Sequence, residues 1–156
     1  MNVDDVLDDA TTVELTAVRL LGSRDHSRKE LRRKLHKRFA DEGLIDEVLD
    51  GLTARNLLSD QRFVENYVEQ RSRKGYGPLR IRAELAERGV SGELLADHLE
   101  QAAPDWAELL DLAAERKFGD RPASDRRELA RRGRFLEQRG FPIGLVRRYL
   151  DRVSDL

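Results

Sequence analysis

Basic side chains are the residues of this chain whose number and spacing best suit a chemical task, the binding of a polyanion. Residues 23–39 hold eight Arg or Lys against two acids, and residues 71–82 hold five with no acid. Residues 125–139 repeat the pattern, with six Arg against three acids. Three basic segments could form a stripe that faces phosphates or the acidic groove of a protein partner.

Twelve residues of these segments form the candidate partner-binding site, and they are Arg28, Arg32, Arg33, Lys37, Arg71, Lys74, Tyr76, Arg80, Arg82, Arg127, Arg131 and Arg134. Tyr76 is included because an exposed ring between Lys74 and Arg80 could stack on a nucleotide or fill a pocket of a partner. A structural role explains Tyr76 equally well. For each basic helix taken alone, the competing interpretation is a solvated face with intramolecular ion pairs.

Catalytic patterns are absent from the sequence. There is no cysteine, which excludes disulfides, thiolate metal sites and a cysteine nucleophile. The three histidines, His26, His36 and His98, are too far apart in sequence to indicate a metal site. The segment Gly75–Pro78 lacks the Lys-Ser/Thr that follows a phosphate-binding loop, and no carboxylate stands alone in an apolar stretch. We therefore expect a binding protein rather than an enzyme, with no cofactor and no metal.

The total charge is balanced, at 29 Lys and Arg against 30 Asp and Glu. Acids concentrate in residues 41–50 and 93–111, which contain no Lys or Arg. Net charge alone therefore predicts no nucleic-acid or lipid partner. No apolar run approaches the roughly 18 residues of a membrane span. The acidic N-terminus is unlike a signal peptide, so we expect a soluble cytoplasmic protein with no membrane partner.

The composition predicts an all-α fold, because Leu and Ala outnumber the β-branched Val, Ile and Thr by more than two to one. A repeat then divides the chain. The pattern of a Leu, eight residues, Leu-aliphatic, three residues and a Leu begins at Leu35, Leu85 and Leu136. Each copy would contain the end of one helix, a tight turn and the buried face of the next helix. A further helix precedes each copy.

Three three-helix repeats follow, over residues 13–56, 57–103 and 104–156, after a disordered acidic N-terminus at 1–12. Units of about 45 residues bury too little surface to be stable alone, so neighbouring units must pack against each other. We therefore expect an elongated, curved array that is a monomer. The expected helices are 13–23, 27–39, 42–55, 60–74, 78–88, 91–102, 105–118, 124–139 and 142–153.

Local signals support these boundaries. Gly89 and Gly140 each follow a helical stretch, where a left-handed residue closes a helix. The first copy has Arg38 at the corresponding place, so its turn must close differently. Ser27 and Asp105 each precede a Glu by three residues, which is typical of a capping box, and Pro78 suits the first turn of a helix.

The second unit resembles a known family. The segment from Leu58 to Val90 (LSDQRFVENYVEQRSRKGYGPLRIRAELAERGV) is closely similar to the central block of the bacterial RecX regulatory proteins. Similarity extends to SRKELRRKL in the first unit and to Trp106, KFG and RFLEQRGF in the third, and covers about residues 15–153. Arg38 departs from the glycine that the family usually has in the first unit.

The resemblance implies tandem three-helix units in an elongated, curved shape. It also implies that the protein binds RecA recombinase, lies along the groove of the RecA–single-stranded DNA filament and limits filament growth. Strand exchange, ATPase and co-protease activity would fall, which would modulate DNA repair and recombination. The alternative is a helical DNA-binding protein that acts independently of RecA by presenting a recognition helix. The balanced net charge disfavours it, because phosphate contacts dominate DNA affinity. Direct contact with single- or double-stranded DNA stays open.

Overall fold

The regular structure of the chain is α-helical, as its composition predicts. The computed structural model describes residues 9–102 and 104–156, which contain one isolated β-bridge and no longer strand. Every helix begins and ends within three residues of its expected range. The helices are α2 (Ala10–Ser23), α3 (Arg28–His36), α4 (Glu42–Ala54), α5 (Asp60–Arg73), α6 (Pro78–Glu87), α7 (Gly92–Ala102), α8 (Trp106–Phe118), α9 (Arg126–Gln138) and α10 (Ile143–Val153).

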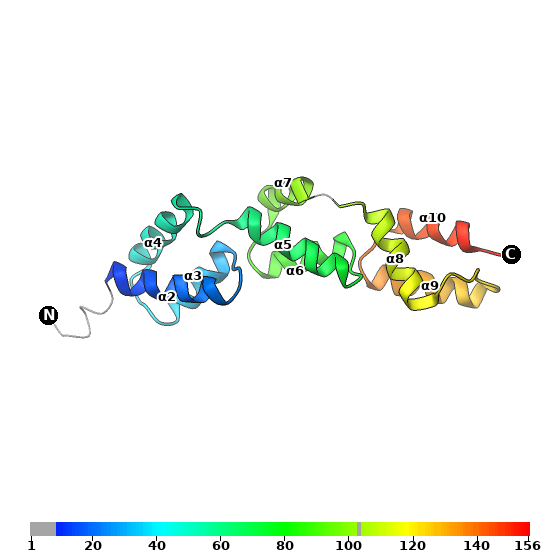
Figure 1. The fold of residues 1–156 in the computed structure, drawn as a ribbon, viewed down its shortest axis with the longest axis horizontal. Helices are drawn as coiled ribbons and strands as arrows, with labels where there is room; N and C mark the ends of the chain where they lie inside the picture. The colour runs from blue at the N-terminus through cyan, green and yellow to red at the C-terminus, as the bar shows by residue number, and fades with distance from the viewer. Residues whose placement is uncertain (1–8, 103) are drawn as a thin grey trace.

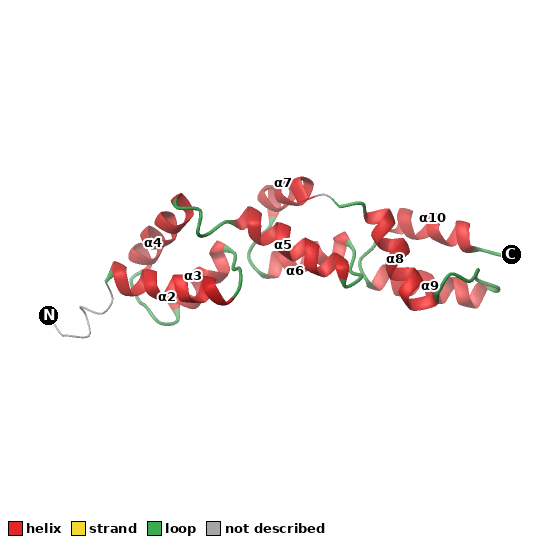
Figure 2. Cartoon of the chain, viewed as in Figure 1, coloured by secondary structure: helices red, strands yellow, loops and turns green. Residues whose placement is uncertain are grey.

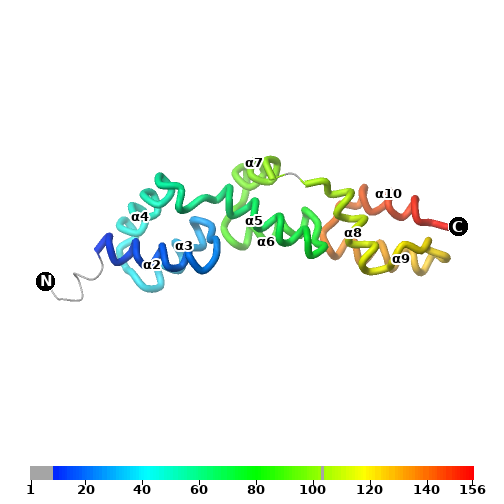
Figure 3. The backbone as a smooth tube through the Cα atoms, in the orientation of Figure 1, coloured from blue at the N-terminus to red at the C-terminus, as the bar shows by residue number. Residues whose placement is uncertain are grey.

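The helices form three consecutive units arranged in an elongated row, as the repeat predicts (Figure 1). Unit 1 contains α2–α4, unit 2 contains α5–α7 and unit 3 contains α8–α10, and within each unit the three helices pack on one another. The tube in Figure 3 follows the chain from unit to unit along the row. Short loops join most helices (Figure 2).

The N-terminal boundary differs from the expected one. Residues 1–8, most of the segment expected to be disordered, lie outside the described residues. Residues 10–12 are helical, so unit 1 begins three residues earlier than expected. The reason is a cap, because the Asp9 side chain accepts a hydrogen bond from the Thr12 backbone N–H.

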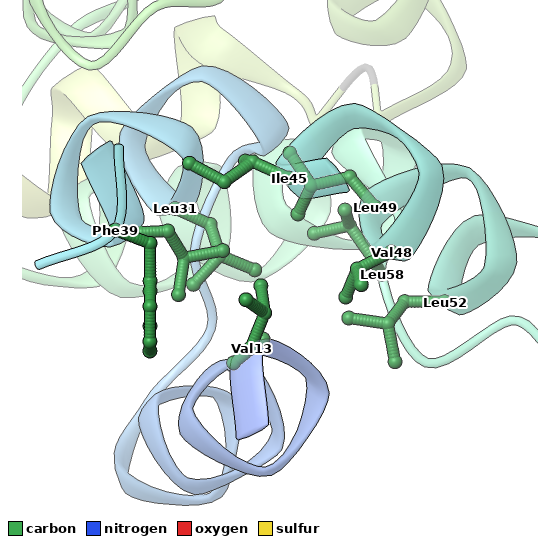
Figure 4. Packing of buried hydrophobic residues seen from close by; sticks show 10 residues of the cluster. Val13, Leu31, Phe39, Ile45, Val48, Leu49, Leu52 and Leu58 are labelled. Atoms are coloured by element: carbon green, nitrogen blue, oxygen red, sulfur yellow. The ribbon is translucent and has the colours of Figure 1, made fainter. Parts of the chain in front are cut away.

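Each unit has a hydrophobic core of its own. In unit 1, Leu31 and Leu35 of α3 meet Val13 of α2 and the Ile45 side of α4, and all are fully buried (Figure 4). The repeat leucines Leu85 and Leu136 are buried in the cores of units 2 and 3. Phe63 and Tyr67 pack inside unit 2, as their spacing of one helical turn predicts. The repeat pattern therefore marks the core.

Units 2 and 3 are joined by a backbone contact between two glycines, which we call joint 2/3. The Gly77 N–H donates to the Arg139 carbonyl at 2.7 Å, and the Leu79 N–H donates to the Gly140 carbonyl at 2.9 Å. A Cβ on Gly77 would lie 2.5 Å from the Gly140 carbonyl carbon. The two backbones approach so closely that only glycine fits there. The sequence suggested only that Gly77 allows a turn.

Units 1 and 2 meet at the corresponding place, joint 1/2, by a related contact. Gly89 has a left-handed φ of +93° and lies against the Lys29 side chain. Ser27 Oγ donates to the Arg88 carbonyl at 2.5 Å, and the Arg28 N–H donates to Asp60 Oδ1 at 2.8 Å. In both joints, therefore, the glycine turn after one middle helix contacts the N-terminus of the preceding unit's middle helix.

The turn of unit 1 closes without glycine, as its sequence predicts. The Phe39 N–H donates to the Leu35 carbonyl at 2.8 Å, and Arg38 does not adopt a positive φ. Phe39 itself is buried in the unit 1 core. Unit 1 is the first of the row, so its turn has no preceding unit among the described residues to contact, and a bulky Arg38 is tolerated.

Replacement of Gly77 tests joint 2/3. We expect Gly77→Ala to lower the free energy of unfolding by about 1–3 kcal/mol, the usual cost of an added methyl group with no room. Urea unfolding followed by circular dichroism measures this change. Gly144→Ala is the matched control, because a Cβ on Gly144 of α10 meets nothing within 4 Å. The control should be neutral or more stable by up to about 1 kcal/mol. Equal urea midpoints for wild type and Gly77→Ala would contradict the joint.

Candidate partner-binding surface

Six of the candidate residues are exposed cations that form no ion pair, side-chain hydrogen bond or contact with an aromatic ring within the described part of the chain. We call them the free cations, and they are Arg33, Lys37, Lys74, Arg82, Arg127 and Arg134. Leu31 and Leu35 are the buried residues of α3 and define the side of the helix that faces the core. Arg33 and Lys37 therefore project into solvent, as the helical period predicts. All three units contribute free cations.

The free cations do not occupy one repeated position. With the repeat leucines aligned, Arg33 corresponds to Ala83 in unit 2 and to Arg134 in unit 3. Arg82 corresponds to Arg32 in unit 1 and to Gly133 in unit 3. The free cations of different units therefore coincide only in part, at Arg33 and Arg134. What the units share is an exposed basic side on the middle helix.

Two candidates of unit 1 are neutralised by the neighbouring acidic helix. Arg28 pairs with Asp50 at 2.7 Å, and Arg32 donates from Nε to Asp46 Oδ1 at 2.9 Å. The hydrogen bond from Arg32 lowers the pKa of Asp46. For these two arginines, the interpretation as intramolecular pairs is correct. Exposed pairs of this kind contribute little to stability.

Arg71 belongs to a partly buried network in unit 2. Its guanidinium donates to both carboxylate oxygens of Glu84, at 2.9 and 2.7 Å, and the Tyr67 hydroxyl donates to the same carboxylate at 2.5 Å. Burial raises the pKa of Glu84, but the hydrogen bonds from Arg71 and Tyr67 outweigh burial and hold that pKa below its usual value. Arg71 therefore fixes α5 to α6 and is not free to bind a partner.

Tyr76 is half-buried, which corrects the expectation of an exposed ring. The guanidinium carbons of Arg71, Arg80 and Arg139 lie 3.8, 4.5 and 4.6 Å from its ring centroid. Arg80 also donates to the Glu84 carboxylate at 3.3 Å. Because three cations from both sides of joint 2/3 cover the ring, Tyr76 has a structural role there. The sequence places Tyr76 near cations but gives no sign that they stack on it.

In unit 3, one arginine of the basic helix is part of the core. Arg132 is only 1% exposed, and it donates to Glu128, to the Tyr149 hydroxyl and to the Arg121 carbonyl at 2.8, 3.1 and 2.9 Å. Its place four residues before the buried Leu136 is the signal that predicts this burial. The candidate Arg131 is exposed, with its guanidinium 5.2 Å from the Phe118 ring.

The arrangement is suited to binding acidic or phosphate groups by charge. Six free cations on three units can contact an extended partner at several points, and exposed Arg and Lys can contact phosphates or carboxylates without a fixed pocket. Among residues 9–102 and 104–156, no three His, Asp or Glu side chains are close enough to hold a metal ion. Within the same residues, no helix has the length and hydropathy needed to cross a membrane.

Comparison with known proteins gives consistent matches. The chain matches the first, second and third three-helix domains of RecX over residues 15–52, 59–99 and 105–150. Regulatory protein RecX of Pseudomonas savastanoi pv. phaseolicola is 45% identical over 145 residues, which cover 93% of this chain and 94% of that protein. The protein of the same name from Ectopseudomonas mendocina is 43% identical, with 93% and 97% covered.

Solved structures match in fold. The crystal structure of RecX from Lactobacillus salivarius superimposes with a TM-score of 0.77 at 21% identity, and the match covers 94% of this chain and 99% of that one. A second crystal structure of regulatory protein RecX gives a TM-score of 0.66 at 20% identity, with 92% and 73% covered. The row of three-helix units is therefore shared with solved proteins.

The Glu84 network predicts a pH-dependent contribution to stability. Because the folded-state pKa of Glu84 lies below its ordinary value of 4.5, the stabilisation is present above about pH 4.5 and is lost as the pH falls through the folded-state pKa. We expect Glu84→Gln to lower the free energy of unfolding by about 1–3 kcal/mol at pH 7. The difference from wild type should narrow below pH 4.5.

Urea unfolding at several pH values measures this difference. Glu69→Gln is the control, because Glu69 forms an exposed pair with Arg73 on α5. We expect that control to change the free energy of unfolding by no more than about 0.5 kcal/mol. A Glu84→Gln effect that is small at pH 7, or constant from pH 7 to pH 3, would argue against the network.

Proposed function

This chain belongs to the RecX family of regulatory proteins, and from that membership we propose that it is a negative regulator of RecA recombinase. It binds the RecA–single-stranded DNA filament along its groove and limits filament growth. Strand exchange, ATPase and co-protease activity of RecA decrease as a result, which modulates DNA repair and recombination. The protein acts in the cytoplasm as a monomer and regulates by binding, without catalysing a reaction.

The observation that carries this proposal is the distribution of free cations along a row of three joined units. A filament presents the same surface repeatedly, and a long ligand can contact several subunits at once. Contacts made by linked units reinforce each other, because after the first contact the others form at high effective concentration. The hydrogen bonds at the two joints support a row whose units keep their relative positions. Such a row can follow a groove better than three loosely linked modules can.

Charge supports the choice of partner. The free cations suit a groove that exposes acidic side chains or DNA phosphates. The acids of α4 and α7 lie in the same row, which would repel bare DNA over part of its length. This mixed surface favours a nucleoprotein filament over DNA alone. Action on DNA independently of RecA is the second candidate, and the experiment below distinguishes the two.

Charge reversal of free cations tests the proposal. We expect the triple variant Arg33→Glu, Lys37→Glu and Arg82→Glu to keep its helix content, because exposed charges each change stability by about 0.5 kcal/mol or less. Its inhibition of the DNA-dependent ATPase of RecA should weaken about tenfold or more, since every 1.4 kcal/mol of lost binding is a factor of about ten. The measurement is ATPase rate against regulator concentration.

Its control must change the net charge equally. Arg19→Glu, Arg147→Glu and Arg148→Glu together alter exposed cations of α2 and α10, away from the middle helices. This control should inhibit as wild type does. Equal weakening in both variants would mean that net charge alone matters, and normal inhibition by the first variant would place the contact surface elsewhere. Tight binding of labelled single-stranded DNA without RecA, together with no effect on the ATPase, would favour the second candidate.

A further inference from the structure

Joint 2/3 contains a cavity whose charged lining is entirely basic. Its volume is about 230 Å³, several times the ~30 Å³ that one water molecule occupies in the liquid. Lys74 comes from unit 2, and Arg116, Lys117 and Arg139 come from unit 3, with Phe135 between them. We call this cavity the joint pocket. Lys74 is the only one of the candidate residues that lines it, so the site was not predicted from the sequence.

At joint 1/2, the cations in the equivalent positions form ion pairs with a carboxylate. Arg24 and Arg88 of joint 1/2 correspond in the repeat to Lys74 and Arg139 of joint 2/3. Both arginines bind one carboxylate, that of Glu30, which accepts from Arg24 at 3.0 Å and from Arg88 at 3.3 Å. A carboxylate between two cations is therefore part of joint 1/2.

Joint 2/3 keeps the cations but not the acids. Arg80 stands where unit 1 has Glu30, and Gly75 stands where it has Asp25. In unit 3, Phe135 stands where unit 2 has Glu84, the carboxylate that binds Arg71. Each replacement removes a negative charge from the neighbourhood of the joint pocket. No carboxylate lines that pocket.

Two of its cations are also held in position. Arg116 donates to the Arg73 carbonyl at 2.7 Å, and Arg139 donates to the Lys74 carbonyl at 3.4 Å while its guanidinium lies 5.0 Å from the Phe135 ring. The ammonium group of Lys117 lies 5.5 Å from the same ring. Guanidinium groups fixed by backbone carbonyls are preorganised to bind an oxyanion, because their side chains lose little conformational entropy on binding.

We propose that the joint pocket binds a phosphate group, either of a single-stranded DNA backbone or of a free oligophosphate. A phosphate would supply the negative charge that Glu30 supplies in joint 1/2, and its several oxygens could accept from lysine and arginine together. Since the cations come from both units, a bound phosphate would also link units 2 and 3 and stabilise the contact between them. The inference goes beyond the proposed function, because it concerns the isolated protein and does not require RecA.

Neutralisation of the two lysines tests the inference. Lys74 and Lys117 are exposed and form no ion pair within the described residues, so Lys74→Gln with Lys117→Gln should fold normally. Two probes are used, both without RecA. Inorganic pyrophosphate should raise the melting temperature of the wild type, because a ligand that binds only the folded state stabilises it. The double variant should lose that shift.

The second probe is a fluorescently labelled oligothymidylate followed by anisotropy at several salt concentrations. We expect the double variant to bind it about tenfold more weakly. The slope of log affinity against log salt should be shallower by about 1.4, the value for two lost contacts with single-stranded DNA. A change with pyrophosphate alone identifies a free oligophosphate as the ligand, and a change with the oligonucleotide alone identifies a phosphodiester backbone.

Arg19→Gln with Arg126→Gln is the matched control, because both residues are exposed arginines outside the joint pocket and remove the same charge. The control should respond to both probes as wild type does. The inference is overturned if neither probe distinguishes the lysine variant from wild type, or if the control responds as that variant does. Because RecA is absent, neither result depends on the proposed regulation of the filament.

Discussion

The close backbone approach between Gly77 and Gly140 is the contact on which the arrangement of the molecule depends. Each unit has a core of its own, and besides Trp106, which packs against the cores of units 2 and 3, hydrogen bonds attach one unit to the next. Two backbone hydrogen bonds at 2.7 and 2.9 Å make that attachment at joint 2/3, and any Cβ on Gly77 would separate the two strands of backbone that form them.

The same contact organises the charges. At joint 2/3 it places Arg139 of unit 3 beside Tyr76 of unit 2, where a ring can be covered by cations from both units. At joint 1/2, the related contact of Gly89 with Lys29 places Arg88 beside Glu30, which completes an ion pair between units. Cations near the joints are therefore involved in holding the row together. Five of the six free cations, by contrast, lie on or at the end of the middle helices, and the sixth, Lys74, lies at joint 2/3.

Divergence between the repeats explains why similar units have different roles. The middle helices keep their buried leucines, while positions around the joints have changed from acid to base or to an aromatic ring, as from Glu84 to Phe135. Such changes leave the core intact because they lie on its edge. As a result of these changes, Arg24 and Arg88 at joint 1/2 share a carboxylate, whereas no carboxylate lines the joint pocket at joint 2/3. The repeat conserves the packing of each unit and allows its surface chemistry to vary.

The helices, the repeat and the core could all be predicted from the amino-acid sequence, because leucines spaced at the helical period, such as Leu35, Leu85 and Leu136 in the three units, mark the buried face of each helix. It also located the basic segments, and Arg33 and Lys37 project into solvent as that period requires. Which of these cations are free, however, depends on how the helices pack. Arg71 and Tyr76 contact partners on other segments, and Arg132 reaches Tyr149 of α10 as well as Glu128 of its own helix. A one-dimensional pattern cannot show which side chains from distant segments meet. The joint pocket escaped prediction for the same physical reason, since its cations come from two units brought together by a glycine contact.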